Sequence, residues 1–141
     1  MRIILTLLIF YISNSIVLGQ TGIIKYDVDT SIFNKRFGDN YISDSISAKI
    51  ICIKLPFTYD KSIEGFRHES NKKIVILFKD EYKIKNKRIS YKKGKILEGD
   101  IESLIESYFI ELDDKTTILL TGIYPSKYEQ LLEKKIEAAA K

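Results

Sequence analysis

The chain has 141 residues and a formal net charge of +4, with 30% charged and 45% hydrophobic residues. That length suits one domain of the common size, about 100–150 residues, and is enough for a core without disulfide bonds. The charge excess is too small for the clustered basic surface of a nucleic-acid-binding protein, and a single cysteine, Cys52, excludes an intramolecular disulfide.

The first segment, residues 1–19, predicts a secretory signal peptide. Arg2 precedes an apolar run over residues 3–12, and Val17-Leu18-Gly19 supplies the small-residue pattern of a cleavage site. The run is shorter than the ~20 apolar residues that a membrane span needs. We therefore expect cleavage after Gly19, a secreted or periplasmic protein with no transmembrane span in the mature chain, and a single domain over residues 20–141.

The early part of the mature chain predicts two strands with an irregular segment between them. Alternation of apolar and polar residues over 22–29 predicts the first strand. Residues 30–46 predict a short helix or an ordered loop, and residues 47–55 predict a β-branched strand that Pro56 ends. We expect Cys52, within this strand, to be a small buried hydrophobe, because no cationic neighbourhood marks it as a reactive thiol.

The middle of the chain predicts a loop, a central strand and a hairpin. Residues 57–71, including the aromatic stretch Phe57–Phe66, predict a loop. Residues 73–78 are the most continuous apolar run of the mature chain, which is typical of a central strand buried on both faces. Alternation around Asn86-Lys87 predicts a solvent-facing hairpin, followed by a turn at Lys92-Lys93-Gly94 and a further short strand.

Residues 100–113 fit two structures. Apolar residues at helical spacing allow a helix capped by Asp100, whereas alternation from Tyr108 onward allows a strand. We favour a hairpin over residues 106–121, because residues 117–122 have the composition of a strand.

The end of the chain predicts an amphipathic helix. Ser126 and Glu129 have the spacing of a capping box. An apolar stripe follows at helical spacing, formed by Tyr128, Leu131, Leu132, Ile136 and Ala139. The whole pattern predicts an α+β fold: a mostly antiparallel β-sheet with a C-terminal amphipathic helix packed on it.

This order of elements resembles the PsbP-like family. The resemblance covers residues 48–141 and rests on a strand ending in Leu55-Pro56, the strand Thr117–Gly122, and Tyr124-Pro125 before the last helix. The family includes the extrinsic subunit P of photosystem II, related bacterial secreted domains and nuclear import factors. It implies an antiparallel sheet flanked by helices and an accessory or binding role without enzymatic activity, but it transfers no functional residue.

Two acidic residues near the mature N-terminus are candidates for a catalytic site. Asp27-Val-Asp29-Thr-Ser31 resembles the aspartyl nucleophile loop of the haloacid-dehalogenase phosphatases, although Ser31 stands where that pattern has Thr or Val. That chemistry needs Mg²⁺ and further carboxylates on a larger α/β domain than this chain offers. A calcium loop is excluded because Ile32 occupies the position of its glycine. We expect two solvent-facing acids.

His68 is the single histidine. A zinc site needs several ligands, and a catalytic triad needs a nucleophile beside the histidine. Ser62 or Ser70 with Asp60 offers such a set, but no Gly-x-Ser-x-Gly sequence supports it. We therefore expect a loop histidine, and the sequence predicts no catalytic residue, metal site or cofactor.

One concentration of positive charge lies between residues 79 and 95. Its predicted partner-binding face consists of Lys83, Lys85, Lys87, Arg88, Lys92 and Lys93. Such a face suits an anionic surface or an acidic partner protein. The alternative is a solvated hairpin whose lysines discourage strand pairing between molecules.

Three functions follow from these patterns. The first is an exported, non-enzymatic binding or accessory protein whose partner is an envelope protein or an anionic surface. The second is a partner-binding inhibitor or immunity-type protein that uses the hairpin of residues 79–95. The third is a small extracytoplasmic hydrolase, which would need a deep pocket holding Asp27, Asp29 or His68. Nucleic acid is not an expected partner.

Overall fold

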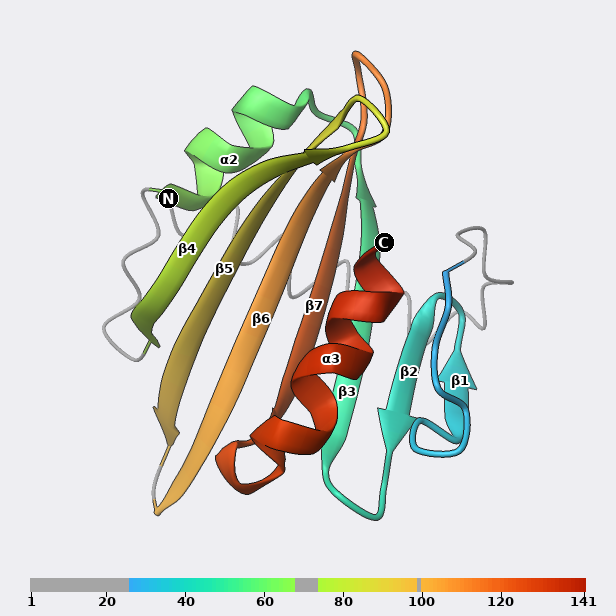
Figure 1. The fold of residues 1–141 in the computed structure, drawn as a ribbon, viewed down its shortest axis with the longest axis vertical. Coiled ribbons are helices and arrows are strands. Elements are labelled where there is room, and N and C mark those ends of the chain that lie inside the picture. The colour runs from blue at the N-terminus through green and yellow to red at the C-terminus, as the bar shows by residue number, and fades with distance from the viewer. Residues whose placement is uncertain (1–25, 68–73, 99) are drawn as a thin grey trace.

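In the part of the chain that the structure describes, seven strands form one antiparallel sheet in the order β1-β2-β3-β7-β6-β5-β4 (Figure 1). The computed structural model describes residues 26–67, 74–98 and 100–141. The strands are β1 (Lys35–Phe37), β2 (Asn40–Ser43), β3 (Ala48–Leu55), β4 (Ile74–Ile84), β5 (Lys87–Glu98), β6 (Ile101–Glu111) and β7 (Thr117–Pro125). The helical elements are α2 (Tyr59–Arg67), a 3₁₀ turn η1 (Ser126–Tyr128) and α3 (Glu129–Ala140).

The two helices pack on opposite faces of the sheet. Helix α3 buries Leu132 and Ile136 against one face, in a cluster that includes Leu120 of β7. Helix α2 buries Tyr59 and Ile63 in a second cluster that includes Leu119. Because successive side chains of a strand point to opposite faces, the neighbours Leu119 and Leu120 belong to different clusters. The predicted α+β architecture with a C-terminal helix on the sheet is confirmed (Figure 1).

Helix α3 starts differently from the prediction. The capping box does not form: residues 126–128 make the 3₁₀ turn, and α3 begins at Glu129 without a side-chain cap. The Glu129 carboxylate instead accepts a hydrogen bond from Lys93 on β5. The predicted apolar stripe is confirmed at Leu132, Ile136 and Ala139, which are buried. Leu131 is 48% exposed and does not belong to the stripe.

The N-terminal prediction is wrong in the part that can be tested. Residues 26–29 form no strand, and the rest of the expected strand at 22–29 lies outside the described residues. Residues 30–46 contain the β1–β2 hairpin rather than a helix or loop. Gly38 turns this hairpin with a φ of 60°, a conformation that glycine adopts without strain.

The expected loop at residues 57–71 contains helix α2. Thr58 starts it, since its Oγ1 accepts a hydrogen bond from the Lys61 amide at 3.3 Å. Tyr59 and Ile63, four residues apart, are the buried anchors. Two apolar residues at helical spacing are too few to distinguish a short helix from an aromatic loop in the sequence.

The apolar run at residues 73–78 is not a central strand. Its described part begins β4, which stands at the edge of the sheet and pairs with β5 alone among the described strands. Val75, Ile76, Leu77 and Phe78 are each more than half exposed. The charged residues 79–81 follow at successive positions, so both faces of β4 meet solvent.

The later strands are longer than predicted. The hairpin around Asn86-Lys87 is confirmed as β4–β5, with positive φ at Lys85 and Asn86. The turn expected at Lys92-Lys93-Gly94 is wrong, since β5 continues through it. Gly94 instead allows β4 and β5 to approach closely, because a Cβ atom at this position would lie 3.2 Å from the carbonyl oxygen of Val75 on β4. The favoured hairpin over 106–121 is confirmed as β6–β7.

Candidate functional site

The six predicted binding residues all lie on the β4–β5 hairpin, but they do not form one face. Arg88 and Lys92 face the α2 side, since Arg88 stacks on Tyr59 and Lys92 lies 5.8 Å from the Phe109 ring centroid. Lys93 faces the opposite side and contacts α3. The alternation of β5 separates these three cations, so the sequence cluster does not make a single basic surface.

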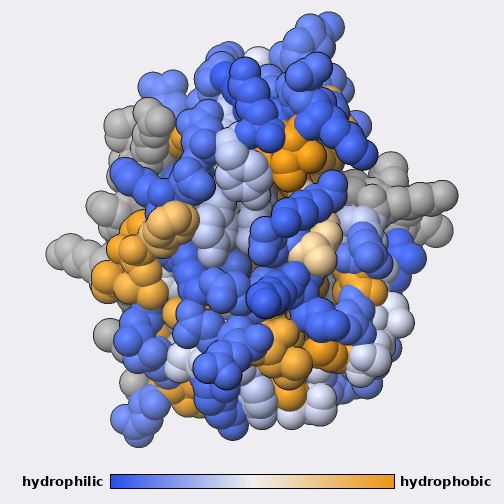
Figure 2. Space-filling view, viewed as in Figure 1, coloured by the Kyte–Doolittle hydropathy of each residue, from blue (hydrophilic) through white to orange (hydrophobic). Residues whose placement is uncertain are grey.

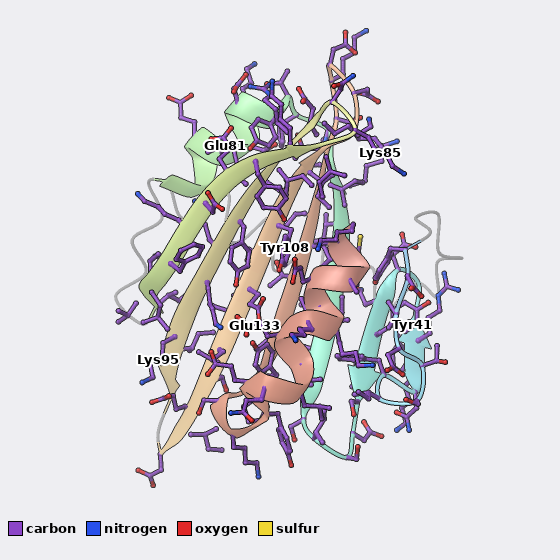
Figure 3. All side chains as sticks on the ribbon, in the orientation of Figure 1. Tyr41, Glu81, Lys85, Lys95, Tyr108 and Glu133 are labelled. Atoms are coloured by element: carbon purple, nitrogen blue, oxygen red, sulfur yellow. The ribbon has the colours of Figure 1, made fainter. Side chains whose placement is uncertain are left out.

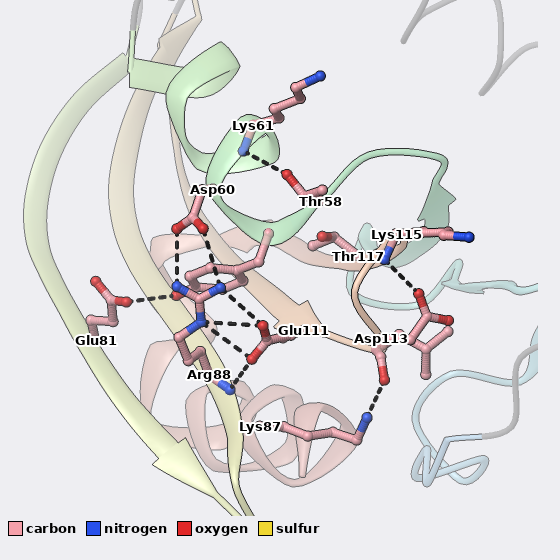
Figure 4. Close-up of polar contacts among 12 residues, drawn as sticks. Thr58, Asp60, Lys61, Glu81, Lys87, Arg88, Glu111, Asp113, Lys115 and Thr117 are labelled. Atoms are coloured by element: carbon pink, nitrogen blue, oxygen red, sulfur yellow. Dashed lines mark hydrogen bonds and ion pairs between the residues drawn. The ribbon is translucent and has the colours of Figure 1, made fainter.

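Arg88 is the centre of an ionic network that holds α2 to the sheet (Figure 4). Its guanidinium nitrogens lie 3.0 Å from Asp60 and 2.9 Å from Glu111, and its Cζ lies 4.4 Å from the Tyr59 ring centroid. Hydrogen bonds from Arg88 lower the pKa of the Glu111 carboxyl. The Tyr59 hydroxyl donates to Glu81 on β4 at 3.2 Å. These contacts make Arg88 a structural residue rather than a free binding group.

Lys93 is likewise occupied. Its side chain is 10% exposed, and its Nζ lies 2.6 Å from Glu129 and 2.7 Å from Glu133, both on α3. Glu133 points from the helix toward the sheet (Figure 3). Desolvation opposes the charge of Lys93, but the hydrogen bonds to Glu129 and Glu133 raise its pKa above the usual value. Lys93 therefore anchors α3.

The remaining predicted cations, Lys83, Lys85 and Lys87, are exposed near the tip of the hairpin, where Lys85 projects away from α3 (Figure 3). Lys87 donates a hydrogen bond to the Leu112 carbonyl in the β6–β7 loop. That loop also carries Asp113, so acidic and basic groups alternate at this end of the molecule. The tip is a small mixed-charge surface.

Of the two acids considered as catalytic candidates, Asp29 has structural partners. Asp29 accepts a hydrogen bond from Lys135 of α3 at 2.6 Å and others from Ser31. Hydrogen bonding from Lys135, followed by that from Ser31, lowers the pKa of Asp29 to about 2. Asp27 lies on the same irregular segment. Asp27 is exposed as expected, whereas Asp29 is held to α3 by Lys135 and its side chain is only 26% exposed.

The proposed histidine set is only partly described. His68 and Ser70 lie outside the described residues. Asp60 binds Arg88, and Ser62 is buried within α2, where its Oγ has no hydrogen-bond partner among the described residues. Cys52 is buried in β3 as predicted, and burial raises the pKa of its thiol to about 12.

The sequence did not indicate the buried carboxylate at the centre of the α3 face. Glu106 of β6 is inaccessible, and three tyrosine hydroxyls donate to it: Tyr91 at 3.2 Å, Tyr108 at 3.4 Å, and Tyr124. Burial raises the pKa of Glu106, whereas the bond from Tyr124 and the charge of Lys93 act against this rise. The three tyrosines and Glu106 form a polar network on the α3 face of the sheet.

The start of β4 exposes consecutive apolar side chains. Phe78 and Val75 belong to the α3 face, since Phe78 lies 5.9 Å from the Tyr91 ring and both pair with Lys93 and Lys95 of β5. Ile76 belongs to the opposite face, where it pairs with Gly94. Figure 2 shows an apolar patch at the margin of the molecule along which β4 runs in Figure 1. We call residues Val75–Phe78 the apolar edge.

Metal-ligand groups, membrane-spanning helices and related proteins were also sought. Among the described residues, no group of three or more His, Cys, Asp and Glu side chains is placed to hold a metal ion. No helix in the described ranges has the length and apolar character of a bilayer span. A scan of the sequence against protein-family models finds no matching family, and a search of curated proteins finds no significant match.

Proposed function

We propose that this protein is an exported, non-enzymatic binding protein that pairs the β4 edge of its sheet with a strand of another polypeptide chain. The observation that carries this proposal is the apolar edge: four consecutive large apolar residues, each 53–54% exposed, on an outermost strand. The signal sequence at residues 1–19 supports export, and the antiparallel sheet with a C-terminal helix is the architecture that a PsbP-like accessory protein would have.

An outermost strand offers a row of backbone N–H and C=O groups that a further strand can bind. Natural proteins usually guard such a strand with charges, a proline, a short length or a β-bulge. Here β4 has 11 residues, and its first charge in the described range is Lys79. The bulge between Ile76 and Phe78 disturbs the strand locally, but it leaves the four side chains exposed. Covering them removes apolar surface from water, which drives association.

The basic hairpin is a weaker candidate surface. Arg88 and Lys93 are engaged within the molecule, and the hairpin tip lies next to the acidic β6–β7 loop. An inhibitor that used the hairpin would therefore rely on Lys83 and Lys85.

Site-specific photocrosslinking in the producing cell tests the proposal. A photoreactive phenylalanine analogue replaces Ile76 in one variant, Lys85 at the hairpin tip in a second, and Leu131 on the exposed side of α3 in a third. We expect adducts with a polypeptide from position 76 and none from position 131, which is 48% exposed and so equally available. Adducts from position 85 without any from position 76 would favour the hairpin instead.

A further inference from the structure

We infer that the partner polypeptide presents an arginine side chain to a set of aromatic and acidic residues on the α3 side of β4 and β5. The inference rests on the proposed function for the nature of the partner, and it adds the chemistry of one side chain that this partner carries. Three aromatic residues and one acid make up the set, which we call the aromatic face: Phe78, Asp80, Tyr82 and Tyr91.

The alternation of side chains brings these four residues to one side of the sheet. Asp80 is the cross-strand partner of Tyr91, and Phe78 and Tyr82, two positions away along β4, project to the same side. The Phe78 ring centroid lies 5.9 Å from that of Tyr91, which in turn lies 4.8 Å from that of Tyr108 on β6. No described helix lies over β4 on this side of the sheet (Figure 1). The rings therefore form a row that is open at its β4 end.

The aromatic face has an excess of negative charge. The described charged side chains around Tyr82 and Tyr91 are five acids and two lysines: Asp80, Glu106, Glu129, Glu133, Glu137, Lys93 and Lys141. Even with Glu106 protonated, four acids face two lysines, and further along β5 the pair Lys95–Glu102 balances itself at 2.5 Å. Burial first, and then Glu106, Glu133 and Glu137, raise the pKa of Tyr91.

The lysines next to Asp80 in the sequence do not neutralise it. Lys79 and Lys83 pair with Lys92 and Arg88 and share the α2 side with them. Asp80 is exposed, and its carboxylate accepts a hydrogen bond from the Glu81 amide at 2.8 Å. Within the described ranges no salt bridge reaches it. Asp80 is therefore available to a cation from outside the molecule.

The α2 side of the same sheet shows what such a set of groups binds. There the Arg88 guanidinium lies over the Tyr59 ring at 4.4 Å and contacts the carboxylates of Asp60 and Glu111. The aromatic face offers the same two kinds of group, rings and carboxylates. In the described part of the chain, however, no cation lies over any of its rings. We expect a partner's arginine to take the place that Arg88 takes on the other side.

Arginine suits this face better than lysine. The guanidinium is planar and weakly hydrated, so it stacks on aromatic rings and forms paired hydrogen bonds to a carboxylate. A lysine ammonium is a compact, strongly hydrated charge that does neither as well. A guanidinium over Tyr91 lies within reach of Asp80, because facing residues of antiparallel strands are only about 5 Å apart.

The test is a titration of the exported, isotope-labelled protein with the peptide acetyl-Gly-Arg-Gly-amide, followed through the backbone amide signals in NMR spectra. We expect saturable shifts at Asp80, Tyr82 and Tyr91, with a dissociation constant on the order of a few millimolar, as suits one exposed side chain. The same peptide with citrulline has the shape of arginine without its charge. This peptide and the lysine peptide should each bind about fivefold or more weakly.

Asp80→Asn should weaken binding of the arginine peptide by about fivefold or more. Asp114→Asn makes the same change at an exposed acid of the β6–β7 loop and should leave binding unchanged. Phe78→Leu removes a ring while keeping an apolar side chain and should also weaken binding. Thermal unfolding establishes that each variant is folded.

Two kinds of result would overturn the inference. One is equal binding of the arginine peptide and either comparison peptide. The other is binding that survives the changes at Asp80 and Phe78, or that falls equally with Asp114→Asn. The proposed function has its own outcome in the crosslinking experiment. Adducts from position 76 without arginine binding retain edge pairing, whereas arginine binding without such adducts removes edge pairing alone.

Discussion

Ile136 of α3 occupies the space above Gly122 of β7. A Cβ atom built on Gly122 would lie 2.3 Å from Ile136 Cδ1 and 2.8 Å from its Cγ2. The missing side chain therefore lets the last helix approach the centre of the sheet. Both residues are buried, and Ile136 has no accessible surface.

Gly122→Ala should lower the free energy of unfolding by about 1–3 kcal/mol, because the added methyl group overpacks the contact with Ile136. Chemical denaturation measures this change. Gly65→Ala in α2 is the matched control: no atom lies within 4 Å of its Cβ position, so the better helix propensity of alanine should stabilise by up to about 1 kcal/mol. Equal effects at the two positions would mean that α3 does not press on β7.

Leu132→Ala should destabilise the fold by about 2–5 kcal/mol, since Leu132 is fully buried beneath α3. Leu131→Ala removes the same atoms from the next position, which is 48% exposed, and should cost far less. Lys134→Ala on the outer face should change little. Urea unfolding of the three variants gives the comparison, and similar losses for both leucines would show that the helix is not docked as described.

Glu106→Gln tests the buried carboxylate through its pH dependence. Burial raises the pKa of Glu106 in the folded protein above its ordinary value, so the folded state binds this proton more tightly than the unfolded chain does. The stabilisation of wild type relative to the glutamine variant is therefore fully present below the unfolded pKa. It declines as pH rises through the folded pKa.

Denaturation of both proteins between about pH 4.5 and pH 8 measures this difference. A wild-type advantage that grows with pH would mean that the tyrosine hydroxyls and Lys93 outweigh burial and hold Glu106 ionised.

Lys135→Met should raise the pKa of Asp29 from about 2 toward its ordinary value of 3.8, because the lysine supplies the strongest hydrogen bond to that carboxylate. In the wild type, the stabilisation from this pair is present above pH 3.8 and is lost as pH falls toward 2. Carboxyl chemical shifts followed by NMR report the titration directly. Lys134→Met should leave the Asp29 titration in place.

The exported protein should begin at Gln20 or within two residues of it, because the apolar segment is short and ends in Val17-Leu18-Gly19. Intact mass and N-terminal sequencing of the secreted species measure the cleavage point. Retention of Met1 on a membrane-bound form would contradict the prediction.

Local patterns predicted much of this fold. The β-branched run before Pro56, the alternation around Asn86 and the spacing of Leu132 and Ile136 each follow from a period that one element imposes on its own residues. Helix α2 was missed because two anchors, Tyr59 and Ile63, make too short a pattern. The capping box failed because Glu129 binds Lys93, a partner from a distant strand.

The candidate site depended on information that no short pattern holds. An apolar run is compatible with a central strand or with an outer one, and only the strand order shows that Val75–Phe78 stand at an edge. The successive charges at Lys79, Asp80 and Glu81 were the available sign that both faces of this strand meet solvent. Arg88 and Lys93 are both basic residues of the same predicted hairpin. Because side chains alternate along β5, Arg88 contacts α2 on one face of the sheet and Lys93 contacts α3 on the other.

The position of β7 between β3 and β6 also orders the folding of the chain in time. The hairpins that end at Leu55 and at Glu111 are complete in sequence before β7 is made, but β3 and β6 become parts of one sheet only through Thr117–Pro125. Cys52, for example, pairs with Leu120. The sheet therefore cannot close until nearly the whole chain is present, and compact folding awaits the last strand.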